Sequence, residues 1–213
     1  MDTNLPYYQA LRNFERKKLI PHRSNIYGSG PPSPIASEET LSYITANCGQ
    51  EILDIGCGIG AYIKKLREIG YNCTGIENSE ENVKKCLRAK LEVKQMNAEN
   101  LRFKDKSFDT VLMIEVLEHL SNPIQALKEA FRVAKKNILI SVPNIGIIPE
   151  MSKYQVIPWH MLEASHLNFF TPQILKNTLK KFSKKIKIFT YGSFASWAIK
   201  EDFHLHIFAI VRI

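Results

Sequence analysis

Short apolar runs alternate with longer amphipathic stretches along most of this chain. Runs rich in isoleucine, leucine and valine predict strands within residues 51–55, 71–78, 91–96, 107–114, 137–144, 185–192 and 203–213. Between most of these runs apolar residues recur at helical spacing, as Ile124, Leu127 and Phe131 do within residues 122–135. Alternating strands and helices with short connections predict an α/β fold, in which helices cover both faces of a parallel sheet.

Two segments depart from this alternation. Residues 1–36 contain no clear strand, and the turn-rich sequence NIYGSGPPSP lies within them. We expect a helical and turn-rich segment that covers either the sheet edge or the mouth of a site. Residues 37–213 then form one domain, in which Ser37 caps the first helix.

The second segment, residues 145–165, is long for a connection between a strand and a helix, and we expect it to be irregular. Its side chains are bulky for a solvated loop; they include Met151, Tyr154, Trp159, His160 and Met161. This pattern predicts a lid over a bound acceptor, or else a groove for a partner.

The sequence EILDIGCGIG, at residues 51–60, reads as a strand followed by a glycine-rich turn. Gly56, Gly58 and Gly60 let the backbone turn sharply and let a ligand approach closely. Dinucleotide sites space their glycines G-x-G-x-x-G, so that a pyrophosphate lies at the helix N-terminus. Here the third glycine comes one residue early, and Asp54 precedes the turn. A carboxylate at that place suits a cationic ligand better than a phosphate.

Composition narrows the class further. The 213 residues are 45% hydrophobic and 23% charged, which fits one globular domain, and no run approaches the roughly 20 apolar residues of a membrane helix. The four cysteines form no C-x-x-C pair, so we expect neither a zinc site nor a disulfide framework, in a reducing cytoplasm. The net charge of +8 comes from dispersed lysines, which still permit RNA or an acidic substrate.

The strand, the acidic residue and the G-x-G-x-G turn resemble the first motif of the class I S-adenosylmethionine (SAM)-dependent methyltransferases, and the resemblance covers roughly residues 51–182. It implies a Rossmann-like, doubly wound sheet of about seven strands, mostly parallel with an antiparallel last strand. It also implies S-adenosyl-L-methionine as the cofactor, which carries a sulfonium and an ammonium and no phosphate. The expected cofactor-binding residues are Asp54, Gly56, Cys57, Gly58, Gly60, Glu77, Asn78, Asn97, Ala98 and Glu115.

Two of these residues have specific expected contacts. Glu77 ends the second strand about 20 residues beyond the glycine turn, where an acidic residue accepts hydrogen bonds from ribose hydroxyls. Asn97 stands where the resembling family usually has an aspartate, followed by alanine, that reads the adenine ring. The amide oxygen of Asn97 still accepts a proton from an amine, so a weaker contact is expected.

The acceptor side is expected at Glu115, Glu118 and His119. If the chain turns helical at Glu115, these positions share one side of the helix. The E-x-x-E-H pattern resembles the metal-linked motif of ubiquinone-pathway O-methyltransferases. It also resembles that of small-RNA 2′-O-methyltransferases, in which a later histidine, here His166, completes the ligand set. Mg²⁺ or a similar divalent ion, a metal-free base at His119 or His166, and a structural role all stay open.

Three functional hypotheses follow. The first is a SAM-dependent methyltransferase that acts on a small-molecule acceptor at oxygen, with Glu118, His119 and His166 around the nucleophile. The second is a metal-dependent 2′-O-methyltransferase of RNA ends. The third is a non-catalytic partner subunit that keeps the cofactor fold. We interpret His204 and His206, which alternate on one face of the last strand, as structural.

Overall fold

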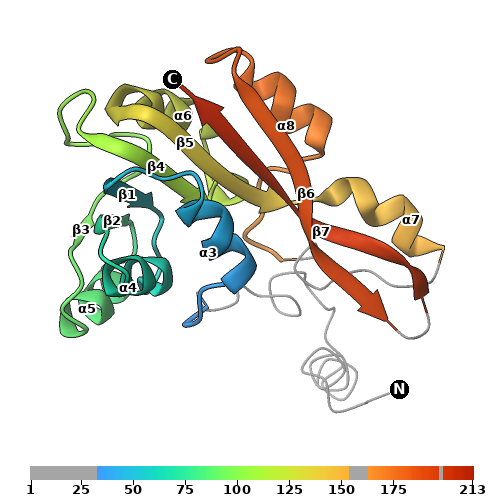
Figure 1. The fold of residues 1–213 in the computed structure, drawn as a ribbon, viewed down its shortest axis with the longest axis horizontal. Coiled ribbons are helices and arrows are strands. Elements are labelled where there is room, and N and C mark those ends of the chain that lie inside the picture. Colours follow the sequence, from blue (N-terminus) through green and yellow to red (C-terminus); the bar gives the residue numbers. More distant parts are fainter. Residues whose placement is uncertain (1–32, 154–162, 197–198) are drawn as a thin grey trace, which may run out of the picture.

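The computed structural model describes residues 33–153, 163–196 and 199–213 (Figure 1). Its helices are α3 (Glu38–Thr45), α4 (Ala61–Glu68), α5 (Glu80–Arg88), the short turn η1 (Leu117–His119), α6 (Pro123–Val133), the short turn η2 (Ile145–Ile147), α7 (Ile148–Ser152) and α8 (Pro172–Leu179). Its strands are β1 (Glu51–Ile55), β2 (Asn72–Glu77), β3 (Val93–Gln95), β4 (Phe108–Ile114), β5 (Ala134–Pro143), β6 (Ile186–Ser196) and β7 (Ile199–Arg212).

All seven strands belong to one sheet, with the order β3-β2-β1-β4-β5-β7-β6. The pairs from β3 to β5 are parallel, whereas β7 pairs antiparallel with both β5 and β6. This topology confirms the predicted doubly wound sheet with an antiparallel last strand. The chain reverses its winding direction between β1 and β4, so the carboxyl ends of these strands form the expected place for a ligand.

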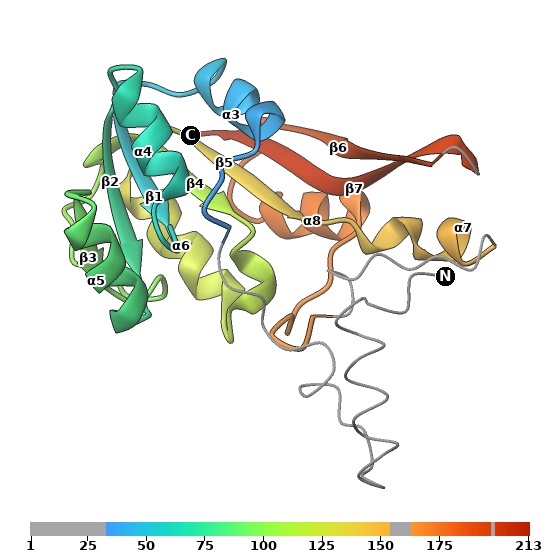
Figure 2. The same ribbon diagram turned by 90° about the horizontal axis from the view of Figure 1, so that it is seen from below.

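Helices cover both faces of the sheet, as the apolar periodicity predicts (Figure 2). Helices α3, α4 and α5 pack on one face through residues such as Ile44, Ile63 and Val83. Helices α6 and α8 pack on the other face through residues such as Leu127 and Leu175. The strands between them are buried on both sides, which explains their continuous apolar runs.

Side-chain caps fix the starts of several helices. Ser37 Oγ accepts from the backbone N–H of Thr40, and Thr171 Oγ1 accepts from that of Ile174. Each cap satisfies one of the donors that a helix leaves unpaired at its first turn. The predicted cap at Ser37 is therefore confirmed.

The segment after β5 differs in part from the expectation. Residues 145–152 are helical rather than irregular, because η2 leads directly into α7. Met151 is fully buried there against Phe203 of β7, so this part packs on the sheet. Tyr154, Trp159, His160 and Met161 lie outside the described residues, as does most of the predicted cover segment 1–36. Within the described ranges, every helix is too short or too polar to cross a bilayer.

Candidate functional site

The glycine turn between β1 and α4 is built as its sequence predicts. Gly56, Gly58 and Gly60 all have positive φ, at 68°, 56° and 81°. A Cβ atom on Gly56 would lie 2.7 Å from Val116 Cγ2, and one on Gly60 would lie 2.4 Å from Leu91 Cδ1. Glycine is therefore required here by both backbone conformation and space.

A cavity of about 370 Å³ opens beside this turn, at the carboxyl ends of β1, β2 and β4. Seven predicted site residues line it: Gly56, Glu77, Asn78, Asn97, Ala98, Glu115 and His119. The sequence did not identify the apolar part of the wall, which includes Met96, Val116 and Leu120. Such residues are apolar like any core residue, so only their place in the fold marks them.

Glu77 reaches from the end of β2 across the glycine turn. Its Oε2 accepts a hydrogen bond from Gly58 N–H at 2.9 Å, and its Oε1 accepts one from Ser79 N–H at 2.8 Å. These bonds fix the carboxylate in the wall of the cavity. A fixed acceptor at this place suits a ligand with paired hydroxyl groups.

Asp54 lies beneath the turn rather than in the cavity wall. It is only 2% exposed, and its Oδ2 has no hydrogen-bond partner among the residues that the structure describes. Burial, together with the nearby charge of Glu77, raises the pKa of Asp54 to about 7. Cys57, Gly58 and Gly60 likewise support the turn without lining the cavity.

Asn97 and Ala98 stand side by side in the wall, as predicted. The Asn97 Oδ1 atom already accepts a hydrogen bond from Glu99 N–H at 2.8 Å. An amide oxygen has two lone pairs, so one remains for a ligand.

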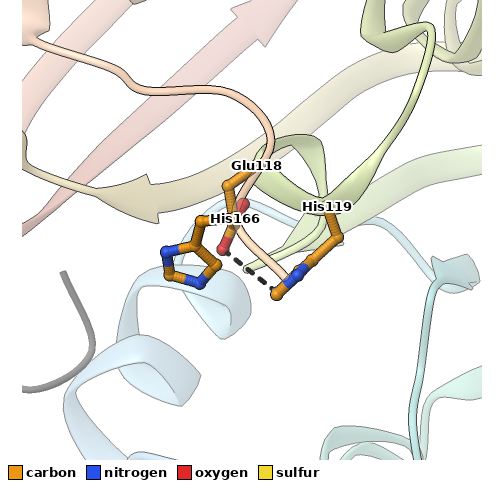
Figure 3. A group of neighbouring side chains, drawn as sticks. All are labelled: Glu118, His119 and His166. Atoms are coloured by element: carbon orange, nitrogen blue, oxygen red, sulfur yellow. Dashed lines mark ion pairs between the residues drawn. The ribbon is translucent and has the colours of Figure 1, made fainter. Parts of the chain in front are cut away.

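Glu118, His119 and His166 form a compact cluster next to the cavity (Figure 3). One ligand atom from each residue lies within 4.8 Å of the others. Glu118 and His166 are buried, whereas His119 is half-buried and also lines the cavity. The structure thus brings together the three predicted catalytic residues, from η1 and from the segment before α8.

The segment that carries His166 is held on η1 by backbone contacts. The N–H groups of Leu167 and Asn168 donate to the carbonyl oxygen of Glu118, at 2.7 and 3.0 Å. The side-chain amide of Asn168 donates to the carbonyl oxygens of Leu117 and Leu120, at 3.0 and 2.7 Å. Asn168 is therefore a structural member of the site that the sequence did not reveal.

Two further residues link the histidines. Glu163 Oε2 lies 3.5 Å from His166 Nε2, and Glu163 Oε1 accepts a hydrogen bond from Ser165 Oγ at 2.7 Å. Ser165 Oγ in turn lies 3.1 Å from His119 Nδ1. These side chains orient both imidazole rings, although no motif in the sequence points to them.

Glu118 is the electrostatic centre of the cluster. Both of its carboxylate oxygens lack a hydrogen-bond partner among the described residues. Burial, with smaller contributions from the charges of Glu115 and Glu163, raises the pKa of Glu118 well above its usual value. A buried acceptor without a donor is unfavourable, so this site is suited to a bound cation or proton.

Glu115 does not occupy the place that helical spacing predicts. It has a left-handed φ of 55°, and the helical turn begins only at Leu117. The Glu115 carboxylate instead accepts a hydrogen bond from Ser141, and its Oε1 lies 3.3 Å from His206 Nδ1. Burial opposes protonation of His206, but the contact with Glu115 raises its pKa above the ordinary value. His206 therefore belongs to the site, which its interpretation as a structural residue missed.

The cluster fits a divalent cation by its donor set. Two imidazoles and one carboxylate converge, and the carboxylate has free lone pairs. Imidazole donors favour transition ions such as Mn²⁺, Fe²⁺ or Zn²⁺ over Mg²⁺, which prefers oxygen ligands. The residues that would hold the ion are Glu118, His119 and His166.

The fold and the site agree with comparisons to known proteins. Residues 53–141 match a family model described as a methyltransferase domain. The chain is 26% identical over 181 residues to the mitochondrial ubiquinone biosynthesis O-methyltransferase of Arabidopsis thaliana, which covers 76% of this chain and 56% of that protein. It is 35% identical over 145 residues to the 2-methyl-6-phytyl-1,4-hydroquinone methyltransferase of Synechocystis, which covers 63% of this chain and 41% of that protein. The chain thus spans about half the length of the curated relatives it matches.

A solved structure extends the likeness to nearly the whole chain. A SAM-dependent methyltransferase from Archaeoglobus fulgidus superposes with a TM-score of 0.66 at 19% identity, over 95% of this chain and 99% of that one. At this identity the superposition establishes the fold, while the matched family model covers β1 to β5 and the glycine turn. The chain therefore carries a class I S-adenosylmethionine-dependent methyltransferase domain.

Proposed function

We propose that the protein transfers a methyl group from SAM to an oxygen atom of a small-molecule acceptor. Two of its relatives are named for ubiquinone biosynthesis and for a hydroquinone, so a ring hydroxyl is the first acceptor class to test. In this proposal the cavity holds the adenosyl part of SAM, with Glu77 on the ribose and Asn97 and Ala98 on the adenine.

One observation carries the proposal. His119 belongs both to the wall of the cavity and to the buried cluster with Glu118 and His166. A nucleophile bound at that junction would have the methyl donor on one side and basic groups on the other. Alignment of this kind supplies most of the acceleration of a displacement reaction.

The chemistry assigns separate tasks to these groups. The S–CH₃ bond breaks with its electron pair returning to sulfur, and a lone pair of the acceptor oxygen forms the new C–O bond. The hydroxyl proton passes to the imidazole of His119 or His166, which Ser165 and Glu163 orient. A divalent ion held by Glu118, His119 and His166 would lower the pKa of the acceptor hydroxyl.

Activity assays with methyl-labelled SAM and a set of catechols and hydroquinones test the proposal. We expect transfer by the wild type, and a rate at least about 100-fold lower in Glu118→Gln and His119→Asn, as for loss of acid-base catalysis. Glu80→Gln, on the exposed face of α5, is the matched control and should keep full activity. Transfer to nitrogen or sulfur compounds alone would contradict the choice of oxygen.

A 2′-O-methyltransferase of RNA ends is the second candidate, and the metal-type cluster supports it. Contact with several phosphates would make binding to a short RNA fall steeply with salt, with a slope of roughly −0.7 per neutralised phosphate. We expect weak binding with a shallow slope. Tight, steeply salt-dependent binding together with methyl transfer to the RNA would favour this candidate instead.

A further inference from the structure

Glu115 forms part of the cavity wall and takes a backbone conformation that is rare for a glutamate. It follows β4 directly, and its φ of 55° lies in the left-handed region. Such a conformation is unfavourable, and it persists only where the surrounding contacts hold it. The contacts of its side chain therefore indicate what this position is for.

Residues from three other elements converge on the Glu115 carboxylate. Ser141 on β5 donates a hydrogen bond to Oε1, and Nδ1 of His206 on β7 lies 3.3 Å from the same atom. The Ser141 hydroxyl lies 2.8 Å from that of Tyr191 on β6, which also accepts from Thr40 Oγ1 at 3.1 Å. Because each hydroxyl is engaged with its neighbours, the series holds the carboxylate in one orientation.

The His206 ring is itself closely seated. Gly192 faces it, and a Cβ atom on that glycine would lie 2.7 Å from His206 Cδ2. The Tyr191 ring packs beside it with centroids 5.3 Å apart, and Glu39 on α3 is the other carboxylate whose charge acts on it. This packing directs Nδ1 of His206 at Glu115.

We propose that His206 is a positioning residue that, with Ser141, holds the Glu115 carboxylate against the cavity so that the protein selects the charged methyl donor over the neutral product. This inference rests on the proposed function, in which the donor is SAM and the product is S-adenosylhomocysteine. The two ligands differ by one methyl group and one positive charge on sulfur. A carboxylate fixed in a partly enclosed site attracts that charge more strongly than one that turns toward water.

Calorimetric titration of both ligands into the wild type, His206→Leu and His206→Gln tests the inference. His206→Leu removes the ring nitrogens, so we expect SAM to bind roughly 10-fold more weakly while the affinity for S-adenosylhomocysteine changes by less than about 3-fold. His206→Gln keeps a hydrogen-bond donor and should hold the ratio of the two affinities within about 3-fold of the wild type. Ser141→Ala should lower the ratio in the same direction as His206→Leu.

His204→Leu is the matched control, since His204 lies on the same face of β7 and its Nδ1 is 2.8 Å from Thr190 Oγ1. It should leave the affinity ratio unchanged, and thermal unfolding of each variant shows that the fold is kept. An equal loss of both ligands in His206→Leu, tighter SAM binding, or the same shift in His204→Leu would overturn this inference alone. A wild type that binds neither ligand would overturn the proposed function along with it.

Discussion

The imidazole rings of His119 and His166 meet edge to face, with their centroids 4.8 Å apart and their planes at 69°. The two residues come from η1 and from the segment before α8, so the contact exists only in the folded chain. It places one ring in the cavity wall and the other in the buried interior behind it. The junction of cofactor and acceptor sites is therefore the part of the molecule where substitutions are most informative.

Replacing Glu118 by Gln tests whether the cluster holds a metal. The buried carboxylate lacks hydrogen-bond donors among the described residues, so removing its charge should stabilise the protein in EDTA. Added Mn²⁺ should raise the unfolding temperature of the wild type and leave that of Glu118→Gln unchanged, because binding to the folded state stabilises it. Thermal unfolding with and without Mn²⁺ measures both effects. A wild type that is indifferent to the ion would leave His119 and His166 as metal-free bases.

Asp54 should make the stability of the ligand-free protein fall as the pH rises. Its folded-state pKa of about 7 lies above the ordinary value of 3.8, so between these values the folded state keeps a proton that the unfolded state has lost. The contribution of Asp54 is therefore most favourable below pH 4 and declines by roughly 1.4 kcal/mol per pH unit up to about pH 7.

The variant Asp54→Asn removes this titration. Chemical denaturation should show it stabilising at pH 8 by more than at pH 5, relative to the wild type. An effect of equal size at both values of pH would show that Asp54 titrates in the ordinary range.

Two glycines with positive φ allow strain and crowding to be separated. Gly60→Ala adds a Cβ only 2.4 Å from Leu91 Cδ1, whereas a Cβ on Gly70 would meet no atom within 4 Å. Gly70→Ala should cost about 1–2 kcal/mol of unfolding free energy, from backbone conformation alone, and should leave SAM affinity unchanged. Gly60→Ala should cost about 1–3 kcal/mol more and weaken SAM binding. Equal costs for the two variants, by urea denaturation, would argue against crowding at the turn.

Asn168→Ala should loosen the cluster without disturbing the cofactor cavity. The substitution leaves the carbonyl oxygens of Leu117 and Leu120 without their side-chain donor, at a cost of about 1–3 kcal/mol. The turnover number should fall while SAM affinity, by calorimetry, stays near the wild-type value. Asn177→Ala, on the exposed face of α8, should change neither quantity. Loss of SAM affinity in Asn168→Ala would place this residue in the cofactor site instead.

Sequence reasoning succeeded where the chemistry is local. The spacing of the glycines fixes the turn, and the distance from Gly56 to Glu77 brings the carboxylate to the same edge of the sheet. It failed at Glu115, because the sequence EVLEH is compatible with a helix and only the contacts with Ser141 and His206 select the left-handed backbone.

The clip on η1 was also outside its reach. Glu163, Ser165 and Asn168 follow a long connection, so their meeting with η1 depends on tertiary packing that no local pattern encodes.

Strand β6 touches the sheet only through β7, which lies between it and β5. The order of assembly is thereby constrained: β7 must zip onto β5, joining Asn137 to Arg212 across a long stretch of chain, before β6 has a central neighbour to dock on. Until that happens the rim of β5 stays open as a template for foreign strands, which makes this late closure the moment of greatest aggregation risk during biogenesis.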